Sequence, residues 1–302
     1  MAQDRPLPPP EQLRERTISA DGLDLCVRIW GDPSKPLVLL QHGAKDHGRS
    51  WDWTVHALLD DYCCIVPDLR GHGDSQRPLG GGYDGLDFSF DMAVIVEAIL
   101  AETGHDALHL IGHSLGGNVA LNYASLQNKR VRSIVCIEGI GFSQKSYNDL
   151  TSQPVAERMR NALERRLKVA GREPRVFSSR EDAVRRLAHL HPKLSDQQAE
   201  HLAHHALREV DGGWRWKHDG QLGGMPVRPF APSEYGQIFS QIDAPVLLMY
   251  GEDSWATSPA KDGRLALFQS ADLILYKDAG HWLHHDQFDD FIRDACAFLE
   301  KH

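Results

Sequence analysis

Short apolar runs that alternate with helical segments most constrain the fold of this chain. Six runs have the length of strands and end in polar or glycine-containing turns: residues 37–41, 63–67, 108–112, 133–137, 245–250 and 273–276. Continuous apolar runs of this length are typical of strands buried on both faces of a parallel sheet. Helical periodicity separates them, as at 90–102 and 115–126. This alternation predicts a doubly wound α/β sheet.

Two further features extend this prediction to the whole chain. Residues 16–20 and 23–30 flank Asp21-Gly22, a turn signal that predicts an N-terminal hairpin and brings the sheet to about eight strands. The alternation stops near Gly139 and resumes near Ile242, and three helix-like stretches lie between them: 155–170, 180–191 and 196–208. We therefore expect a core domain of residues 1–138 and 236–302 that carries a mainly helical cap at 139–235.

Charge and composition narrow the classes of partner. The chain has 42 acidic and 33 basic residues, so its net negative charge disfavours nucleic acid and anionic lipid. A basic stretch at 151–193 is either a solvated helical face or a patch that attracts anionic substrates. No signal peptide or membrane-length apolar run is evident, and five cysteines are an odd number for a disulfide framework. We expect a cytoplasmic protein that acts on a small molecule.

A glycine-flanked serine is the strongest chemical motif. Gly112-His113-Ser114-Leu115-Gly116 lies between an apolar strand and a helix, the context that makes a G-x-S-x-G pentapeptide informative. The tight turn would strain the serine backbone, and side chains at both glycines would collide with neighbouring elements. The serine oxygen would then project above the sheet beside a helix N-terminus. Ser114 is the predicted nucleophile.

Two other strand ends complete the predicted site. His42-Gly43-Ala44 directly follows one apolar run, which would place the Ala44 N–H beside that of Leu115 as an oxyanion hole. His281 follows the final strand in Ala279-Gly280-His281, so it would lie on the same carboxyl edge of the sheet as the serine. We predict that His281 is the general base.

Taken in order, these motifs resemble the α/β-hydrolase superfamily, specifically its capped members related to epoxide hydrolases and haloalkane dehalogenases. The resemblance also rests on Trp51 and on the run Asp68-Leu69-Arg70-Gly71-His72-Gly73-Asp74-Ser75. It implies an α/β-hydrolase fold, in which the 68–75 loop is mostly structural. Epoxide hydrolases and dehalogenases carry aspartate as nucleophile, whereas this chain carries serine. Ester hydrolysis through an acyl-enzyme is therefore the leading interpretation, without a cofactor or metal.

The acid that orients the histidine is open between two candidates. The superfamily usually places an aspartate three residues after a glycine at the end of strand seven, but Gly251-Glu252-Asp253-Ser254 puts Ser254 there and Asp253 one residue early. The dehalogenase branch takes its acid from the end of strand six, where this chain has Glu138. A carboxylate directly after an apolar strand is costly to bury unpaired, so an imidazolium partner would explain it. We prefer Glu138 and keep Asp253 as the alternative.

The remaining expectations concern the pocket and competing functions. Trp51 beside the oxyanion loop and Trp214 near the end of the cap are candidates for substrate contact. His201, His204 and His205 lack a cysteine or carboxylate at a known metal-site spacing, so we expect helix-face histidines and no metal. The same triad would also support hydrolysis of a carbon–carbon bond in a diketone-type substrate. A ligand receptor with slow or no turnover is the alternative outside enzymes.

Overall fold

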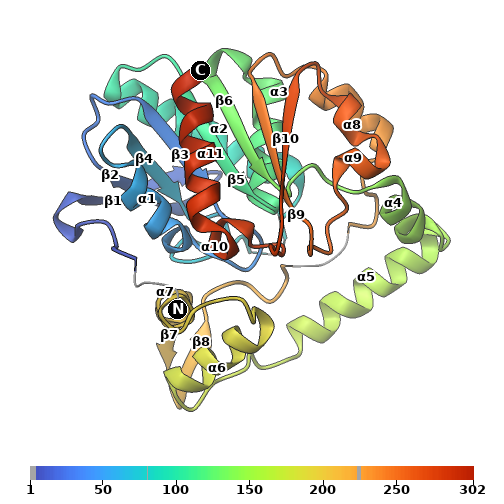
Figure 1. Cartoon of the computed structure of the whole chain (residues 1–302). Helices are drawn as coiled ribbons and strands as arrows, with labels where there is room; N and C mark the ends of the chain where they lie inside the picture. Colours follow the sequence, from blue (N-terminus) through green and yellow to red (C-terminus); the bar gives the residue numbers. More distant parts are fainter. Residues whose placement is uncertain (1–4, 80, 223–225) are drawn as a thin grey trace.

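An eight-stranded sheet forms the centre of the computed structural model, which describes residues 5–79, 81–222 and 226–302 (Figure 1). The strand order is β1-β2-β4-β3-β5-β6-β9-β10. β2 runs antiparallel to both neighbours, and the strands from β4 to β10 in this order are parallel. The strands are β1 (Leu13–Ala20), β2 (Leu23–Trp30), β3 (Leu37–Gln41), β4 (Cys63–Pro67), β5 (Leu108–His113), β6 (Val131–Ile137), β9 (Val246–Gly251) and β10 (Ala271–Tyr276). The predicted fold class is confirmed.

Burial explains why the strands could be located from the sequence. Every residue of β3, β4, β5 and β9 is buried, as expected for central strands covered on both faces. β3 and β4 have the predicted bounds, and the other four runs differ by one or two residues at an end. The predicted hairpin pairs Ala20 with Leu23 around Asp21-Gly22, where both residues have positive φ.

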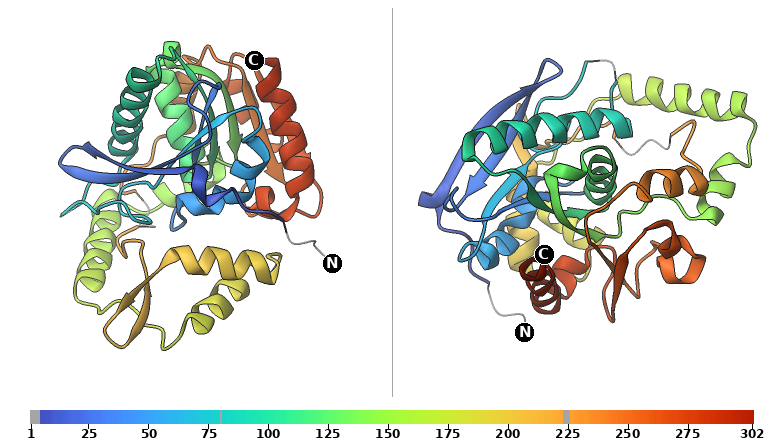
Figure 2. Two further views of the ribbon diagram at one scale, coloured as in Figure 1. Left: turned by 90° about the vertical axis from the view of Figure 1, so that its left-hand side faces the viewer. Right: turned by 90° about the horizontal axis from the view of Figure 1, so that it is seen from above.

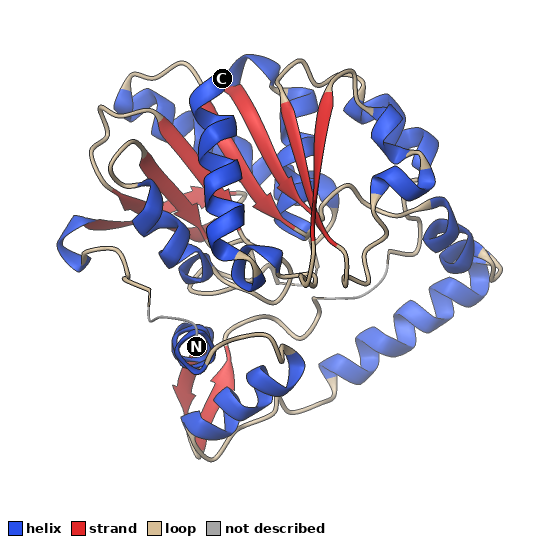
Figure 3. Cartoon of the chain, in the orientation of Figure 1, coloured by secondary structure: helices blue, strands red, loops and turns tan. Residues whose placement is uncertain are grey.

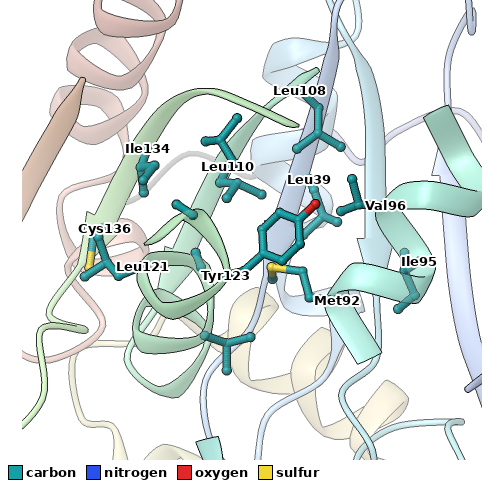
Figure 4. Packing of buried hydrophobic residues seen from close by; sticks show 14 of the residues in the cluster. Leu39, Met92, Ile95, Val96, Leu108, Leu110, Leu121, Tyr123, Ile134 and Cys136 are labelled. Carbon is teal, nitrogen blue, oxygen red and sulfur yellow. The ribbon is translucent and has the colours of Figure 1, made fainter. Parts of the chain in front are cut away.

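Helices cover both faces of the sheet, as the end-on views show (Figure 2). One face packs against α2 (Gly85–Thr103), α3 (Leu115–Leu126) and α8 (Pro232–Phe239), and the other against α1 (Asp52–Leu58) and α11 (Phe288–Lys301). Figure 4 shows how Met92 and Val96 of α2 and Tyr123 of α3 meet Leu39 and Leu110 of the strands. Each fully buried side chain of this size stabilises the fold by about 2 kcal/mol.

A separate group of elements lies between β6 and β9 in the sequence. It crosses below the carboxyl ends of the parallel strands (Figures 1 and 3). The group comprises α4 (Gln144–Thr151), α5 (Val155–Ala170), α6 (Arg180–Leu190), α7 (Asp196–Ala206), β7 (Leu207–Val210) and β8 (Gly213–Trp216). The helix expected at 196–208 ends at Ala206 because the chain then enters the β7–β8 hairpin, which the sequence did not predict.

The predicted boundary at residue 235 falls inside α8. Tyr235 and Phe239 of this helix both belong to the buried cluster on the face of the sheet that α2 and α3 cover, so α8 packs as part of the core. The remaining short helices are α9 (Pro259–Asp262), α10 (Leu283–Asp286), η1 (Pro10–Gln12), η2 (Gly48–Trp51), η3 (Asn128–Arg130) and η4 (Arg264–Leu267). Among the described residues, none of the helices combines the length and apolar character needed to cross a bilayer.

Candidate active site

Ser114 occupies a strained turn between β5 and α3. Its φ of 53° and ψ of −116° lie in a region that non-glycine residues rarely adopt. The turn is also tightly packed, because a Cβ on Gly112 would lie 2.6 Å from the Gly116 carbonyl oxygen and one on Gly116 would lie 2.3 Å from that of Gln41. The Ser114 N–H donates to the Ile137 carbonyl at 2.7 Å. These contacts keep the Ser114 backbone in the strained conformation that the motif predicted.

Ser114 lines a cavity of about 940 Å³ at the carboxyl edge of the sheet. Strand ends supply Ala44, Leu115, Glu138 and Tyr250 to its wall. The inserted segment and adjoining loops supply further lining residues, which include Phe142, Ser143, Ser146, Arg165, Arg166, Leu222, Arg228, Phe230, Trp255 and Arg264. The candidate nucleophile, one candidate acid and the candidate oxyanion donors thus share one cavity.

Glu138 is the carboxylate that meets His281. Its Oε2 lies 2.5 Å from His281 Nδ1, and its side chain is fully buried. Glu138 follows β6 directly and has a φ of 51°, which turns the chain out of the strand. The geometry leaves His281 Nε2 as the ring nitrogen that is free to take a proton from a nucleophile.

Two further donors hold the Glu138 carboxylate in place. Its Oε1 accepts the Gly251 N–H at 2.8 Å, and its Oε2 accepts the Ser254 hydroxyl at 2.5 Å. Ser254 stands where the commoner pattern has the acid, and here it supports the acid from β6 instead. The sequence identified Ser254 at this position but did not predict that its hydroxyl binds Glu138.

Asp253, the alternative acid, is not brought to His281. It is exposed and its carboxylate pairs with Lys193 Nζ at 2.7 Å. Its backbone N–H donates to the Ala279 carbonyl at 3.0 Å. The structure thus corrects this alternative, because adjacent positions on the loop point in different directions.

The oxyanion loop packs directly on the serine turn. A Cβ on Gly43 would lie 3.3 Å from Ser114 Cβ and 2.8 Å from His113 Nδ1, so only glycine allows this approach. His42 Nε2 accepts the Leu69 N–H at 3.0 Å, and its Nδ1–H therefore donates to the Gly43 carbonyl at 2.8 Å. Because that carbonyl belongs to the same peptide group as the Ala44 N–H, His42 fixes the direction of this donor.

Two residues beside His281 were not assigned roles from the sequence. His113 Nε2 lies 2.9 Å from the His281 carbonyl oxygen and donates to it. Burial lowers the pKa of His113 well below its usual range, so the ring is neutral. Trp255 lines the cavity with its ring centroid 4.5 Å from that of His281, and it is 79% exposed. His113 positions the His281 loop from behind, and Trp255 covers the ring from the cavity side.

The two tryptophans predicted to contact substrate lie outside the cavity lining. Trp51 is fully buried, and its ring packs 4.8 Å from that of His284. Trp214 pairs with Phe177 through backbone hydrogen bonds and packs beneath Arg180, 4.0 Å from the guanidinium carbon to the ring centroid. Both predictions are corrected, because Trp51 is enclosed by protein and the partly buried Trp214 packs against Arg180 and Phe177 rather than lining the cavity.

The 68–75 loop has the structural role that the resemblance implied. The buried Asp68 carboxylate accepts the N–H groups of Gly48 and Asp74 and pairs with Arg28 at 2.9 Å. Burial is the largest single influence on Asp68 and opposes its ionisation, but the Arg28 guanidinium, the His42 ring and the N–H groups of Asp74 and Gly48 together outweigh it. They hold the pKa of this carboxyl well below its usual range. The loop thereby ties β2 to the chain that follows the oxyanion loop.

Comparison with known proteins agrees with this geometry. A family model described as alpha/beta hydrolase fold matches residues 36–288. A serine hydrolase-like protein of Danio rerio is 30% identical over 231 residues, which cover 75% of this chain and 68% of the relative. A bifunctional esterase/perhydrolase of Acinetobacter calcoaceticus is 24% identical and covers 93% and 98% of the two chains. The solved thioesterase domain from the curacin biosynthetic pathway superposes with a TM-score of 0.77 at 25% identity, over 93% of this chain and 98% of that domain.

Proposed function

The chain belongs to the alpha/beta hydrolase fold family, and from this premise we propose that it is a serine hydrolase that cleaves a carboxylic ester, or a related acyl bond, of a small molecule. The observation that carries the proposal is the buried Glu138 carboxylate 2.5 Å from His281 Nδ1, in the wall of the cavity that Ser114 enters. Relatives named as a serine hydrolase-like protein and an esterase support the same class of reaction.

In the proposed reaction, the Ser114 hydroxyl attacks the carbonyl carbon of the substrate. His281 Nε2 takes the hydroxyl proton, and Glu138 holds the proton on Nδ1 and stabilises the imidazolium. The N–H groups of Ala44 and Leu115 bind the oxyanion of the tetrahedral intermediate. His281 then protonates the leaving alcohol, and a water molecule, deprotonated by the same imidazole, releases the acid from Ser114.

We also propose that the inserted segment, predicted at 139–235 but ending before α8 at Pro232, forms a lid over this reaction. The segment leaves the core one residue after Glu138 and contributes Phe142, Arg165 and Arg228 to the cavity wall. Of the carboxylates in the wall, Glu138 bonds to His281, Asp84 caps the start of α2 and Asp87 lies 3.6 Å from Arg70. The arginines of the wall then favour an ester that carries a negative or polar group.

All five cysteines lie within the described residues and are free thiols. Free thiols are typical of proteins in reducing compartments, which supports a cytoplasmic location as part of the proposal.

A p-nitrophenyl ester series from acetate to laurate tests the proposed reaction. We expect multiple turnovers for the wild type and for Ser146→Ala, which removes another serine from the cavity wall. Ser114→Ala should lose turnover and should no longer react with a fluorophosphonate probe. Persistent turnover and labelling in folded Ser114→Ala would refute the proposed nucleophile. Absence of turnover on every ester, with labelling of Ser114 retained, would instead reject the ester substrates and leave carbon–carbon hydrolysis or a receptor.

A further inference from the structure

A cluster of histidines joins the inserted segment to the core, outside the cavity. His201 and His205 are four residues apart on α7, so they share one face of that helix. This face lies against Asp52, the first residue of α1, whose side chain is 1% exposed. None of these three residues lines the cavity around Ser114. The sequence could not show the grouping, because the carboxylate comes from a distant element.

The three side chains lie close enough to share a ligand. His201 Nε2 is 3.1 Å from Asp52 Oδ2, and one potential ligand atom from each residue lies within 4.8 Å of the other two. A tetrahedral metal at about 2.0–2.1 Å from nitrogen and oxygen ligands requires those atoms to be about 3.3 Å apart. The His201–Asp52 pair already has about this spacing, and His205, whose ligand atom lies within 4.8 Å of the other two, completes the group.

We propose that Asp52, His201 and His205 form a binding site for a divalent transition metal such as Zn²⁺. Two imidazoles and one carboxylate suit zinc, cobalt or nickel better than magnesium or calcium, which prefer oxygen ligands throughout. Two histidines at i and i+4 on one helix are a recurrent zinc-binding arrangement. Three protein ligands leave a fourth position for water.

Arg49 sets the main competition for this site. Its Nε lies 2.9 and 2.8 Å from the two carboxylate oxygens of Asp52, so the guanidinium now supplies the positive charge beside that carboxylate. A metal bound to Oδ2 must displace the guanidinium from that oxygen. Because the two cations repel each other, removing Arg49 should tighten metal binding.

His204 provides a matched control on the same helix. Its Nδ1 lies 3.0 Å from Arg180 Nη1, and it is not part of the group around Asp52.

His47 lies on the other side of the cluster. Its ring centroid is 6.3 Å from that of His205, and its Nε2 is 3.0 Å from the Leu202 carbonyl oxygen. A bound metal would add a direct link between α7 and α1 beside this contact between α7 and the residue that precedes η2.

Metal titration of tag-free, chelator-treated protein tests the site. We expect one equivalent of Zn²⁺ by calorimetry, and one equivalent of Co²⁺ with the visible spectrum of a histidine-ligated ion. His201→Ala and His205→Ala should each weaken Zn²⁺ binding at least about tenfold, whereas His204→Ala should stay within about twofold of the wild type. Circular dichroism of each variant checks that it is folded.

Two further results bear on the geometry. Excess Zn²⁺ should raise the Tm of the wild type and of His204→Ala but not that of His205→Ala. Arg49→Gln should bind Zn²⁺ more tightly than the wild type. The proposal is overturned if the wild type shows no saturable binding, if folded His201→Ala and His205→Ala bind as tightly as the wild type, or if Arg49→Gln binds more weakly.

Discussion

Replacing Glu138 by glutamine tests the arrangement of the site most directly. Three donors converge on this carboxylate: the Gly251 N–H, the Ser254 hydroxyl and His281 Nδ1–H. Glutamine has one carbonyl oxygen, so its NH₂ group must face at least one of these donors. An NH₂ group that faces His281 favours the tautomer with the proton on Nε2, which cannot accept the proton of Ser114.

The size of the effect follows from the charge that is removed. A carboxylate and an imidazolium about 4 Å apart attract each other by about 4 kcal/mol at an effective dielectric constant of 20. That energy corresponds to about a thousandfold in rate, and the wrong tautomer extends the expected loss in kcat to about 10³–10⁴-fold. KM for the same ester should change little, because the carboxylate is buried behind His281.

Steady-state kinetics on the best p-nitrophenyl ester measures this loss. Asp253→Asn is the matched control, because Asp253 is the neighbouring loop carboxylate and pairs with Lys193 at the surface. It should keep kcat within about twofold. Near-wild-type kcat in Glu138→Gln together with a loss of several orders of magnitude in Asp253→Asn would refute the assignment of the acid.

Three other predictions use the same surroundings. Gly43→Ala should lower kcat at least about tenfold with normal far-UV circular dichroism, because the added methyl would lie 2.8 Å from an imidazole nitrogen; unchanged kcat would contradict the packing of this loop. The lowered pKa of Asp68 beside Arg28 stabilises the fold above about pH 4, and this contribution disappears as the pH falls further. Urea unfolding of Asp68→Asn should therefore show a loss of about 3 kcal/mol at pH 7 that shrinks toward pH 3, and a constant difference would count against the ion pair. Trp255→Ala should raise KM several-fold more than it lowers kcat, because the exposed indole covers His281 from the substrate side; an equal loss in kcat alone would instead show that the indole orients the imidazole.

The elements that the sequence predicted well share a local signal. β3 and β4 are almost continuously apolar, with Gln41 as the polar last residue of β3, and both are bounded by turns, so their ends could be placed to the residue. The turn at Ser114 likewise depends on Gly112 and Gly116, which lie two residues before and after it in the chain. Where the residues that fix a structure are neighbours in sequence, the pattern was sufficient.

The parts that were not predicted depend on contacts between distant segments. Trp51 could meet either substrate or protein, and only the position of His284 on α10 shows that it is enclosed. The β7–β8 pairing takes up the last two residues of the helix expected through residue 208, because the hairpin overrides local helical preference. Asp52 likewise meets His201 only after α1 and α7 have packed together.

Because the acid Glu138 follows β6, the two segments around His281 differ in how far they tolerate redesign. The 252–258 loop tolerates it, and the junction that follows Glu138 does not. The 252–258 loop supplies the Ser254 hydroxyl and the Trp255 indole around His281 and Glu138. Insertions beyond Trp255 should therefore leave the carboxylate in place and offer a position at which to graft new specificity. The junction at Gly139 is the opposite case, because a Cβ there would lie 2.6 Å from Gly117 Cα. A chimaera that exchanges the inserted segment should therefore be spliced after Gly141, with residues 138–141 kept from this chain.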